Sequence, residues 1–323
     1  MRRGAILLPL WLFSFGSASP PAITEFSILS PGSDPVDIAT GPDGALWFTE
    51  QHADRIGRIS TRGAVTEFPL PIPGSFARGI IAGPDGAVWF TELPGRIGRI
   101  STEGAISELT LPGGRGVTEP VEIAAGPDGN LWFTDYYDRI GRVTTVGALT
   151  YFALPNGSSP RGITAGPDGA LWFTEFSANH IGRITTSGLL TEFPMAPGTG
   201  PLGIAAGPDG ALWFTESLAN RIGRITTTGA ITETGVPTPN SSPTGIAVSA
   251  DGSVWFSEPA VDRIGRLAPR GGIADWPLPD SGFPYGVAIG PDGAAWFTEF
   301  TGGRIGRASA GPRPLPRLVP AYP

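Results

Sequence analysis

The stretch PLGIAAGPDGALWFTESLANRIGRITTTGAITE, residues 201–233, contains four short apolar segments, each bounded by Gly, Pro, Asp or Thr. None of the segments is long enough for a helix. The Gly-Pro-Asp-Gly sequence at 207–210 is typical of a hairpin turn, because an Asp-Gly pair tolerates positive φ. The segment around Trp213 is continuously apolar, as expected for a strand buried on both faces. The stretch therefore predicts four antiparallel strands.

This four-strand unit recurs along the whole chain. Its tryptophan occurs seven times, at intervals of 40 to 43 residues: Trp47, Trp89, Trp132, Trp172, Trp213, Trp255 and Trp296. A four-stranded unit of this length, repeated seven times, is typical of propeller blades. We therefore predict an all-β fold, a seven-bladed β-propeller of four-stranded antiparallel blades.

The two ends of the repeat are offset by one strand. The repeat opens with a fourth-strand motif, Ile23 to Phe26, which has no blade before it. It closes on a third-strand motif, Arg304 to Arg307, which has no fourth strand after it. An N-terminal strand that joined the last blade would close the ring and remove an open sheet edge. This is the closure we predict, and it places the propeller at residues 21–308.

The segments outside the repeat have other compositions. Residues 1–18 combine two arginines, an apolar run and small residues, as in a signal peptide cleaved after Ala18. This predicts export to the periplasm or the extracellular space. An uncleaved anchor is the alternative, although the run is shorter than the ~20 residues of a spanning helix. Residues 309–323 are Pro-rich and are expected to be flexible. We expect a monomer with no membrane span after leader cleavage.

Composition excludes several classes of function. The chain has 323 residues, a net charge of −7 and no basic run, so a nucleic-acid partner is not expected. It has no cysteine, which excludes disulfides, thiolate metal sites and a cysteine nucleophile. The 48 Gly and 35 Pro residues favour turn-rich β structure, and the 40% hydrophobic content provides a large core.

Two charged positions repeat in every blade. The second strand ends in a carboxylate, and the third strand contains an Ile-Gly-Arg motif. The carboxylates are Glu50, Glu92, Asp135, Glu175, Glu216, Glu258 and Glu299, and the arginines are Arg58, Arg99, Arg142, Arg183, Arg224, Arg266 and Arg307. We interpret them as seven equivalent structural pairs or hydrogen-bonded strand ends. A ring of acid–base groups is the alternative. The Gly-Pro-Asp-Gly aspartates fit turn chemistry rather than Ca²⁺ binding.

The deviations from the repeat are expected on one face of the ring. The Gly-Pro-Asp-Gly and Thr-Thr-x-Gly turns should share one face, and the variable loops should share the other. Near the channel mouth on the variable face, the inner strands of blades one to four carry Asp37, Arg78, Glu122 and Arg161. Their alternating signs fit either an ion-pair network or the polar floor of a pocket.

Aromatic residues accompany these charges on the variable face. They are Phe76, Tyr136, Tyr137, Phe176, Phe283 and Phe300. Aromatics around a polar mouth fit a small-molecule or peptide site. The two histidines lie in different blades: His52 is expected on the surface, and His180 replaces the arginine that begins the third strand elsewhere. No Ser-His-Asp set, HExxH motif or phosphate-binding loop is present.

The repeated Trp-Phe-Thr-Glu, Ile-Gly-Arg-Ile-Thr and Ile-Thr-Glu-Phe-Pro-Leu-Pro motifs resemble the virginiamycin B lyase (streptogramin B lyase) family over residues 21–308. The resemblance implies a seven-bladed propeller and, in active members, Mg²⁺-dependent elimination that linearises a cyclic depsipeptide antibiotic. Family histidines open the inner strands of the last two blades, where this chain has Thr244 and Tyr285. One family glutamate corresponds to Phe283. Another corresponds to Phe300, or to Glu299 with a shift of one residue.

The resemblance therefore implies the lyase scaffold without its histidine pair. Our first hypothesis is a ligand- or protein-binding propeller, with Asp37, Arg78, Glu122, Arg161, Tyr285, Tyr136, Phe176 and Phe300 as binding residues. The second is a carbon–oxygen lyase acting through a relocated site, with Asp37, Glu122 and Tyr285 as candidates and Mg²⁺ as a cofactor implied by the resemblance. The third is an interaction module of the cell envelope. The expected partners are a small molecule, a peptide or a protein on the variable face.

Overall fold

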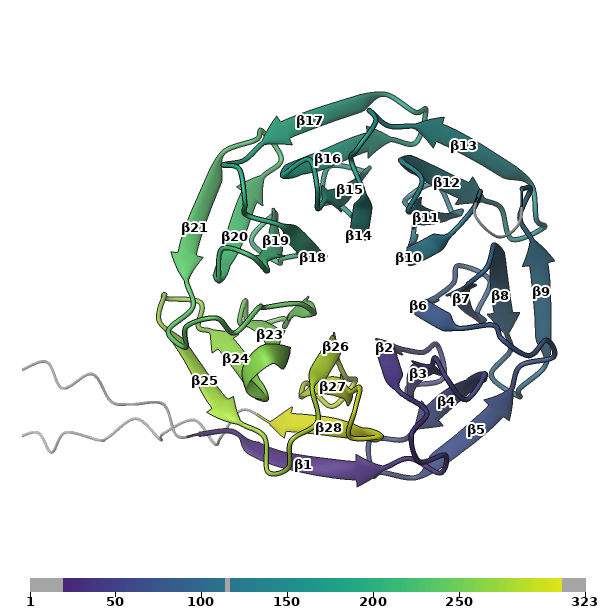
Figure 1. The fold of residues 1–323 in the computed structure, drawn as a ribbon, viewed down its shortest axis with the longest axis horizontal. Helices are drawn as coiled ribbons and strands as arrows, with labels where there is room; N and C mark the ends of the chain where they lie inside the picture. Colours follow the sequence, from purple (N-terminus) through teal and green to yellow (C-terminus); the bar gives the residue numbers. More distant parts are fainter. Residues whose placement is uncertain (1–19, 114–116, 310–323) are drawn as a thin grey trace, which may run out of the picture.

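The computed structural model describes residues 20–113 and 117–309, so the predicted leader and almost all of the predicted tail lie outside it. The described chain forms seven four-stranded antiparallel sheets around a central axis (Figure 1). This confirms the seven-bladed propeller predicted from the sequence. Within these residues, no helix has the length and apolar character needed to cross a membrane.

The seven blades follow one another along the chain. Blade one contains β2 (Pro35–Thr40), β3 (Leu46–Glu50), β4 (Arg55–Ile59) and β5 (Val65–Pro69). Blade two contains β6 (Ala77–Ala82), β7 (Val88–Glu92), β8 (Arg96–Ile100) and β9 (Ile106–Thr110). Blade three contains β10 (Pro120–Ala125), β11 (Leu131–Asp135), β12 (Arg139–Val143) and β13 (Leu149–Ala153). Blade four contains β14 (Pro160–Ala165), β15 (Ala170–Glu175), β16 (His180–Thr185) and β17 (Leu190–Pro194).

The last three blades repeat the same order. Blade five contains β18 (Pro201–Ala206), β19 (Ala211–Glu216), β20 (Arg221–Thr226) and β21 (Ile231–Gly235). Blade six contains β22 (Ile246–Val248), β23 (Val254–Glu258), the 3₁₀ turn η1 (Pro259–Val261), β24 (Arg263–Leu267) and β25 (Ile273–Pro277). Blade seven contains β26 (Pro284–Ile289), β27 (Ala295–Glu299) and β28 (Arg304–Ser309).

The fourth strand of blade seven comes from the other end of the chain. Strand β1 (Ala22–Ser27) pairs antiparallel with β28, with Ala22 opposite Ser309 and Ser27 opposite Arg304. In Figure 1 the purple β1 accordingly lies beside the yellow β28. The last blade is thus built from both ends of the described chain, and β28 extends one residue beyond the boundary expected from the sequence.

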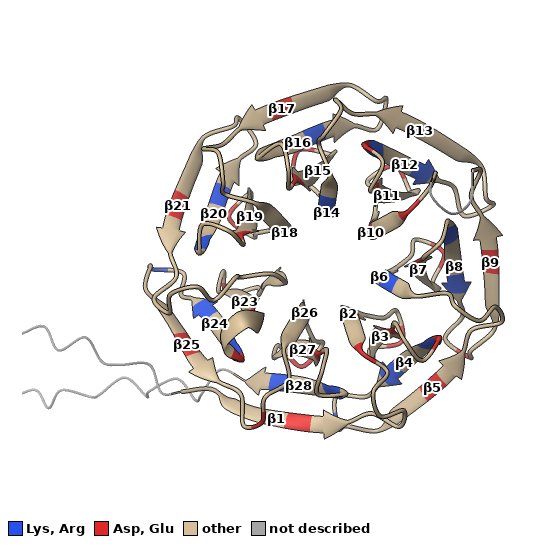
Figure 2. Cartoon of the chain, viewed as in Figure 1, with Lys and Arg blue, Asp and Glu red and all other residues tan. Residues whose placement is uncertain are grey.

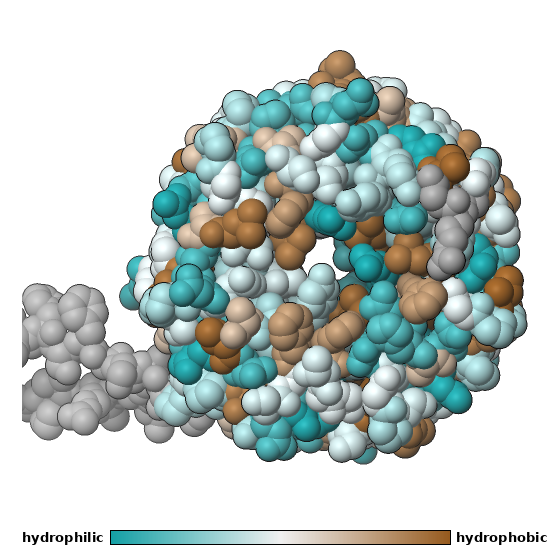
Figure 3. Space-filling model, in the orientation of Figure 1, coloured by the Kyte–Doolittle hydropathy of each residue, from teal (hydrophilic) through white to brown (hydrophobic). Residues whose placement is uncertain are grey.

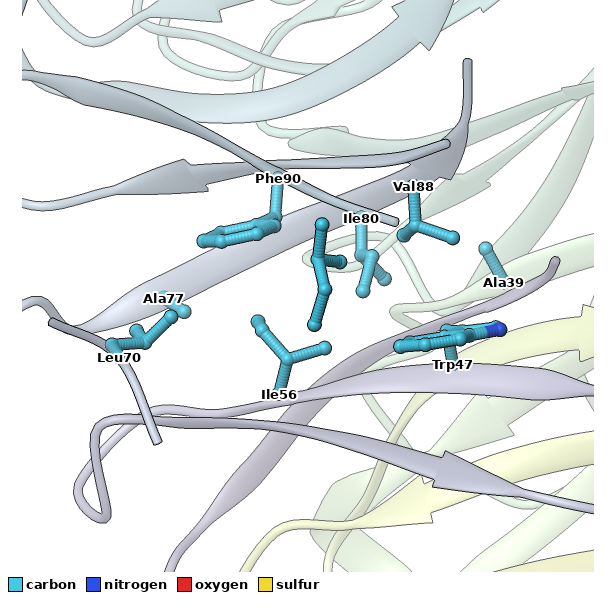
Figure 4. Close-up of a cluster of buried hydrophobic side chains, with 9 residues drawn as sticks. Ala39, Trp47, Ile56, Leu70, Ala77, Ile80, Val88 and Phe90 are labelled. Atoms are coloured by element: carbon cyan, nitrogen blue, oxygen red, sulfur yellow. The ribbon is translucent and has the colours of Figure 1, made fainter. Parts of the chain in front are cut away.

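The core is divided into clusters, one between each pair of neighbouring blades. Figure 4 shows the cluster in which Trp47 and Ile56 of blade one pack against Ile80 and Phe90 of blade two. The tryptophan is fully buried. An equivalent cluster, containing Phe48 and the fully buried Trp296, joins blade one to blade seven. Burial of these large apolar surfaces drives each blade onto its neighbour.

A hydroxyl group also links each blade to the next. Thr49 Oγ1 accepts a hydrogen bond from the Asp37 amide at 3.1 Å and donates one to the Arg78 carbonyl at 2.7 Å. The same donation is made by Thr91, Thr134, Thr174, Thr215, Ser257 and Thr298. The Asp37 amide belongs to a bulge, since β2 shifts register against β3 between Pro35 and Ile38. The hydroxyls thereby stabilise the bulged backbone of the inner strands, which lie next to the central axis.

Charged groups form a repeated hydrogen-bond network on the face of the ring that carries the Gly-Pro-Asp-Gly and Thr-Thr-x-Gly turns, which we call the turn face. Asp43 accepts hydrogen bonds from Trp47 Nε1 at 3.0 Å and from Arg58 Nε at 2.6 Å. The register places Trp47 opposite Arg58 and Glu50 opposite Arg55. The Ile-Gly-Arg arginine therefore pairs with the turn aspartate. The interpretation of the two repeated charges as a pair, such as Glu50 with Arg58, is therefore wrong, because these residues lie toward opposite ends of the paired strands.

Candidate functional site

A cavity of about 700 Å³ lies at the centre of the ring and is lined by residues of all seven blades. A volume of this size suits a small organic ligand. In Figure 3 both hydrophobic and hydrophilic side chains border the central opening. The lining combines apolar residues such as Ile81 and Leu202 with several charged and polar groups. We refer to this cavity as the central pocket.

The structure brings most of the predicted site residues to the central pocket. It is lined by Asp37, Arg78, Glu122, Arg161, Phe176, Thr244 and Tyr285. Figure 2 shows the charged residues on the inner strands β2, β6, β10 and β14. The inner strands β18, β22 and β26 carry no charge. One side of the pocket is therefore charged, and the other is neutral.

The two carboxyl groups meet above blade two. Asp37 Oδ2 accepts a hydrogen bond from the Ile80 amide at 2.9 Å, and Asp37 also hydrogen-bonds to Glu122. Glu122 approaches Gly79, where a Cβ atom would lie 2.5 Å from Glu122 Oε1. Glycine at this position thus leaves the space in which the acidic side chains of blades one and three reach each other.

The carboxyl pair holds a proton near neutral pH. Burial raises the pKa of Asp37 to about 6, against hydrogen bonds from backbone amides that lower it. Burial and the Asp37 charge raise the pKa of Glu122 well above its ordinary value. A hydrogen bond between two carboxyl groups requires a proton on one of them, and the raised pKa values of both groups favour that shared proton. The pair is therefore a candidate acid–base unit.

The two arginines of the pocket do not complete an ion-pair network. Neither Arg78 nor Arg161 has an ion-pair partner among residues 20–113 and 117–309. Arg78 Nε is buried and lacks a hydrogen-bond partner in the same ranges. The Arg161 guanidinium lies 5.0 Å from the ring centre of Tyr136 and 5.8 Å from that of Phe176. Both cations thus remain available to an anionic group in the pocket.

The aromatic residues lie at the pocket and around its edge. Tyr285 lines the pocket, and burial raises the pKa of its phenol, which stays protonated at neutral pH. The Phe300 ring lies 6.4 Å from Tyr285 and 6.2 Å from Phe283. Tyr136 contacts Arg161 of the pocket, and Tyr137 packs edge-on against Tyr136; both tyrosines are exposed. Tyr285 can donate a hydrogen bond to a ligand but is a poor base.

Glu299 lies away from the central pocket. Its side chain is fully buried, and its Oε2 accepts a hydrogen bond from Arg304 Nε at 2.8 Å. Burial raises its pKa to about 7. Glu299 is one of the repeated second-strand carboxylates, each of which lies near the first residue of the third strand. Its position fits a structural role rather than contact with a ligand in the pocket.

The two histidines also lie outside the pocket lining. His52 lies in the loop after β3, and its Nδ1 is 2.6 Å from Asp34 Oδ2. The His52 ring packs edge-on against Phe76. His180 lies at the start of β16, 3.6 Å from Glu175. Sequence reasoning treated His180 as an arginine substitute and did not single out Glu192, which the structure brings to the same cluster. The signal that could have found it is the missing arginine between two carboxylates.

The residues at the positions of the family glutamates do not fit an Mg²⁺ ion. Mg²⁺ binds through oxygen atoms in octahedral geometry. Phe283 and Phe300 offer only aromatic carbon, and their rings pack together at the edge of the pocket. The pocket carboxylates that remain, Asp37 and Glu122, belong to blades one and three and share a hydrogen bond.

Comparisons with known proteins support the fold at the level of sequence and structure. The virginiamycin B lyase family model matches residues 18–137 and 117–313. A streptogramin B lyase structure is 39% identical, with a TM-score of 0.86 over 90% of this chain and 98% of that one. Selenomethionine-substituted virginiamycin B lyase from Staphylococcus aureus is 41% identical, with a TM-score of 0.84 over 89% and 99%.

A third solved structure contains a ligand. It is a catalytically inactive histidine-to-alanine variant of virginiamycin B lyase from Staphylococcus aureus with quinupristin, again 41% identical, with a TM-score of 0.84 over 89% of this chain and 99% of that one. A comparison with curated proteins finds no match. Since the family model spans nearly the whole repeat, the chain belongs to the virginiamycin B lyase family.

Proposed function

We propose that this protein binds a small anionic ligand with apolar parts in the central pocket and does not linearise streptogramin B. The observation that carries the proposal is the pair of arginines, Arg78 and Arg161, which line the pocket without forming an ion pair within 4.0 Å in the described chain. A guanidinium that is partly removed from water gains most from a carboxylate, sulfonate or phosphate group. The apolar and aromatic lining suits the remainder of such a ligand.

The second half of the proposal rests on the absence of an imidazole from the pocket lining. The Staphylococcus aureus relative with quinupristin is inactive when a histidine is replaced by alanine. Here neither histidine lines the pocket, and Thr244 and Tyr285 do so instead. A threonine hydroxyl and a protonated phenol are poor bases for abstracting a carbon-bound proton at neutral pH.

Binding can be tested with 8-anilino-1-naphthalenesulfonate, which carries an anionic group on an aromatic body and fluoresces when bound. We expect Arg78→Met and Arg161→Met each to weaken binding at least about tenfold, the loss of about 1.4 kcal/mol of interaction with the sulfonate. Arg62→Met is the matched control, since Arg62 is an exposed residue of a turn on the other face. Equal affinity in all four proteins would contradict the proposal.

A second candidate function is favoured by the hydrogen-bonded carboxyl pair. Asp37 and Glu122, with their raised pKa values, could exchange a proton with a substrate, as in a carbon–oxygen lyase with a relocated site. This candidate predicts ring opening of a cyclic depsipeptide that is lost in Asp37→Asn and retained in Tyr285→Phe. Turnover that survives Asp37→Asn would exclude it.

We also propose that the protein is exported. The support is the composition of residues 1–18, with two arginines before an apolar run and small residues around Ala18. Expression of the full chain in a bacterium with a periplasm, followed by cell fractionation and mass spectrometry, tests this. The expected product begins at Ser19 outside the cytoplasm, and an intact chain in the cytoplasm would contradict export.

A further inference from the structure

Blade four differs from the other blades at the start of its third strand. In the other six, this position is an arginine that forms an ion pair with the carboxylate ending the second strand, with an acidic residue of the fourth strand, or with both. Arg96 of blade two illustrates this, with its Nε 3.1 Å from Glu92 and 3.7 Å from Glu108 on the fourth strand. Arg304 of blade seven likewise lies 2.8 Å from Glu299 and 3.5 Å from Glu25. The arginine supplies a positive charge beside buried acidic groups.

In blade four the carboxylates remain but the arginine is replaced by His180. The pairing of β15 with β16 places Glu175 directly opposite His180. The pairing of β16 with β17 places Pro194 opposite His180 and Glu192 opposite Gly182. Alternation along a strand therefore puts Glu175, His180 and Glu192 on one face of the blade. One ligand atom from each of the three lies within 4.8 Å of the others.

The polar atoms of this cluster are not satisfied within the described chain. Glu175 is fully buried, and both of its carboxylate oxygens lack a hydrogen-bond partner there. The same is true of His180 Nδ1 and of Glu192 Oε1. Leaving polar atoms this deeply buried without partners is unfavourable, and a bound cation would satisfy them.

We propose that Glu175, His180 and Glu192 bind one Zn²⁺ ion. Imidazole nitrogen and carboxylate oxygen are both zinc ligands, and three protein ligands leave a fourth position for a water molecule. Imidazole disfavours Mg²⁺ and Ca²⁺, which select oxygen donors. Two ligands of a tetrahedral zinc lie about 3.3 Å apart. The 3.6 Å between His180 Nδ1 and Glu175 Oε2 is close to that value, and a ligand atom of Glu192 lies within 4.8 Å of both residues.

The proposed ion takes the place of an arginine charge, so its role is structural. His180 is 31% exposed, which gives an ion access from solvent, while Glu175 is fully buried. The site lies outside the lining of the central pocket. A chain that binds no zinc would therefore leave the proposed binding function unaffected, and a chain that binds zinc would not establish that function.

The test is isothermal titration of the untagged protein with ZnCl₂. We expect one Zn²⁺ per chain in the wild type and loss of that ion in His180→Arg, which restores the residue of the other six blades. Zinc should also raise the Tm of the wild type and leave that of His180→Arg unchanged. Glu192→Gln should weaken zinc binding at least about tenfold while its Tm without zinc shows that it folds.

Two further variants make the result decisive. Asp37→Asn removes a carboxylate of the central pocket and should leave the zinc stoichiometry unchanged. Arg96→His creates the same residue set in blade two, between Glu92 and Glu108, and should add a second zinc ion. Zinc binding that persists at full affinity in both His180→Arg and Glu192→Gln would overturn the proposal, as would a wild type that binds none.

Discussion

The two faces of the ring are built from the same blades but use their charges differently. On the turn face, one arrangement recurs: an aspartate such as Asp43 accepts hydrogen bonds from a tryptophan and an arginine. At the pocket mouth the corresponding positions differ from blade to blade, and there the charged groups lack ion-pair partners or meet a like charge. The repeated groups of the turn face are satisfied and stabilise the fold, whereas the deviating groups at the pocket remain available for chemistry.

Replacement of a repeated core residue should have the largest effect on stability. Trp47→Ala should lower the free energy of unfolding by about 3–5 kcal/mol, because the indole is fully buried between two blades. The matched change at the pocket is Tyr285→Phe, whose hydroxyl makes no hydrogen bond within the described chain, and it should cost less than about 1 kcal/mol. Urea unfolding followed by circular dichroism measures both. Equal losses would show that the two regions do not differ in this way.

The hydroxyl links between blades should have the next largest effect. Thr298→Val keeps the shape of the side chain but removes a donor to the Val36 carbonyl at 2.8 Å and an acceptor for the Gly286 amide at 2.9 Å. We expect a loss of about 1–3 kcal/mol, because buried backbone groups are left unpaired. Thr134→Val, at a junction within the chain, is the control and should cost a similar amount. A much smaller loss at Thr298 would show that the closing junction is not held in the same manner.

The repeated carboxylates give the fold an unusual pH dependence. Burial raises the pKa to about 7 for Glu50, Glu92, Glu216, Glu258 and Glu299. A folded-state pKa above the unfolded value of about 4.5 contributes stability below that value, and the contribution is lost as the pH rises through 7. The turn aspartates, such as Asp43, have lowered pKa values and destabilise the fold only when protonated in acid.

These opposing shifts predict a stability maximum on the acid side of neutrality. The free energy of unfolding should be higher at about pH 5 than at about pH 8 by more than about 1.4 kcal/mol, the equivalent of one pKa unit for one group. Urea unfolding at the two pH values checks this, and Glu216→Gln should reduce the difference. Greater stability at the higher pH would show that the carboxylates are ionised in the folded protein.

The smallest effect is expected from a single charge pair of the turn face. Arg58→Gln removes the ion pair with Asp43, in which the arginine is 30% exposed. Because water screens such pairs, the loss should be below about 1 kcal/mol, as judged by thermal unfolding. A loss as large as that of Trp47→Ala would mean that the turn network, rather than the interblade core, holds the ring together.

The sequence predicted the fold because the repeat leaves little choice. Seven tryptophans at nearly equal spacing define the blades, and the lone fourth-strand motif at Ile23 indicates which blade lacks a strand. The same logic placed Asp37, Arg78, Glu122 and Arg161 on one face near the axis, where the structure has them. Strand alternation and turn chemistry are local properties, so they can be read from one chain.

The contacts within each site could not be predicted in this way. The alternating signs at the mouth suggested that neighbours pair, yet Asp37 meets Glu122 two blades away, over the gap that Gly79 leaves. That contact depends on the bulge, which gives adjacent residues of the inner strand different directions. Similarly, the sequence indicated only that His180 replaces an arginine. The strand register shows that it lies on the same face as Glu175 and Glu192.

We propose that this family member retains the propeller but binds a ligand in the central pocket instead of catalysing elimination. The most direct measurement is incubation of the protein with a streptogramin B antibiotic and Mg²⁺, followed by chromatography and mass spectrometry. We predict intact cyclic antibiotic at high protein concentration, with an active family lyase as the positive control. A linear product of unchanged mass would contradict the claim by demonstrating elimination, and a product heavier by one water would contradict it by demonstrating hydrolysis.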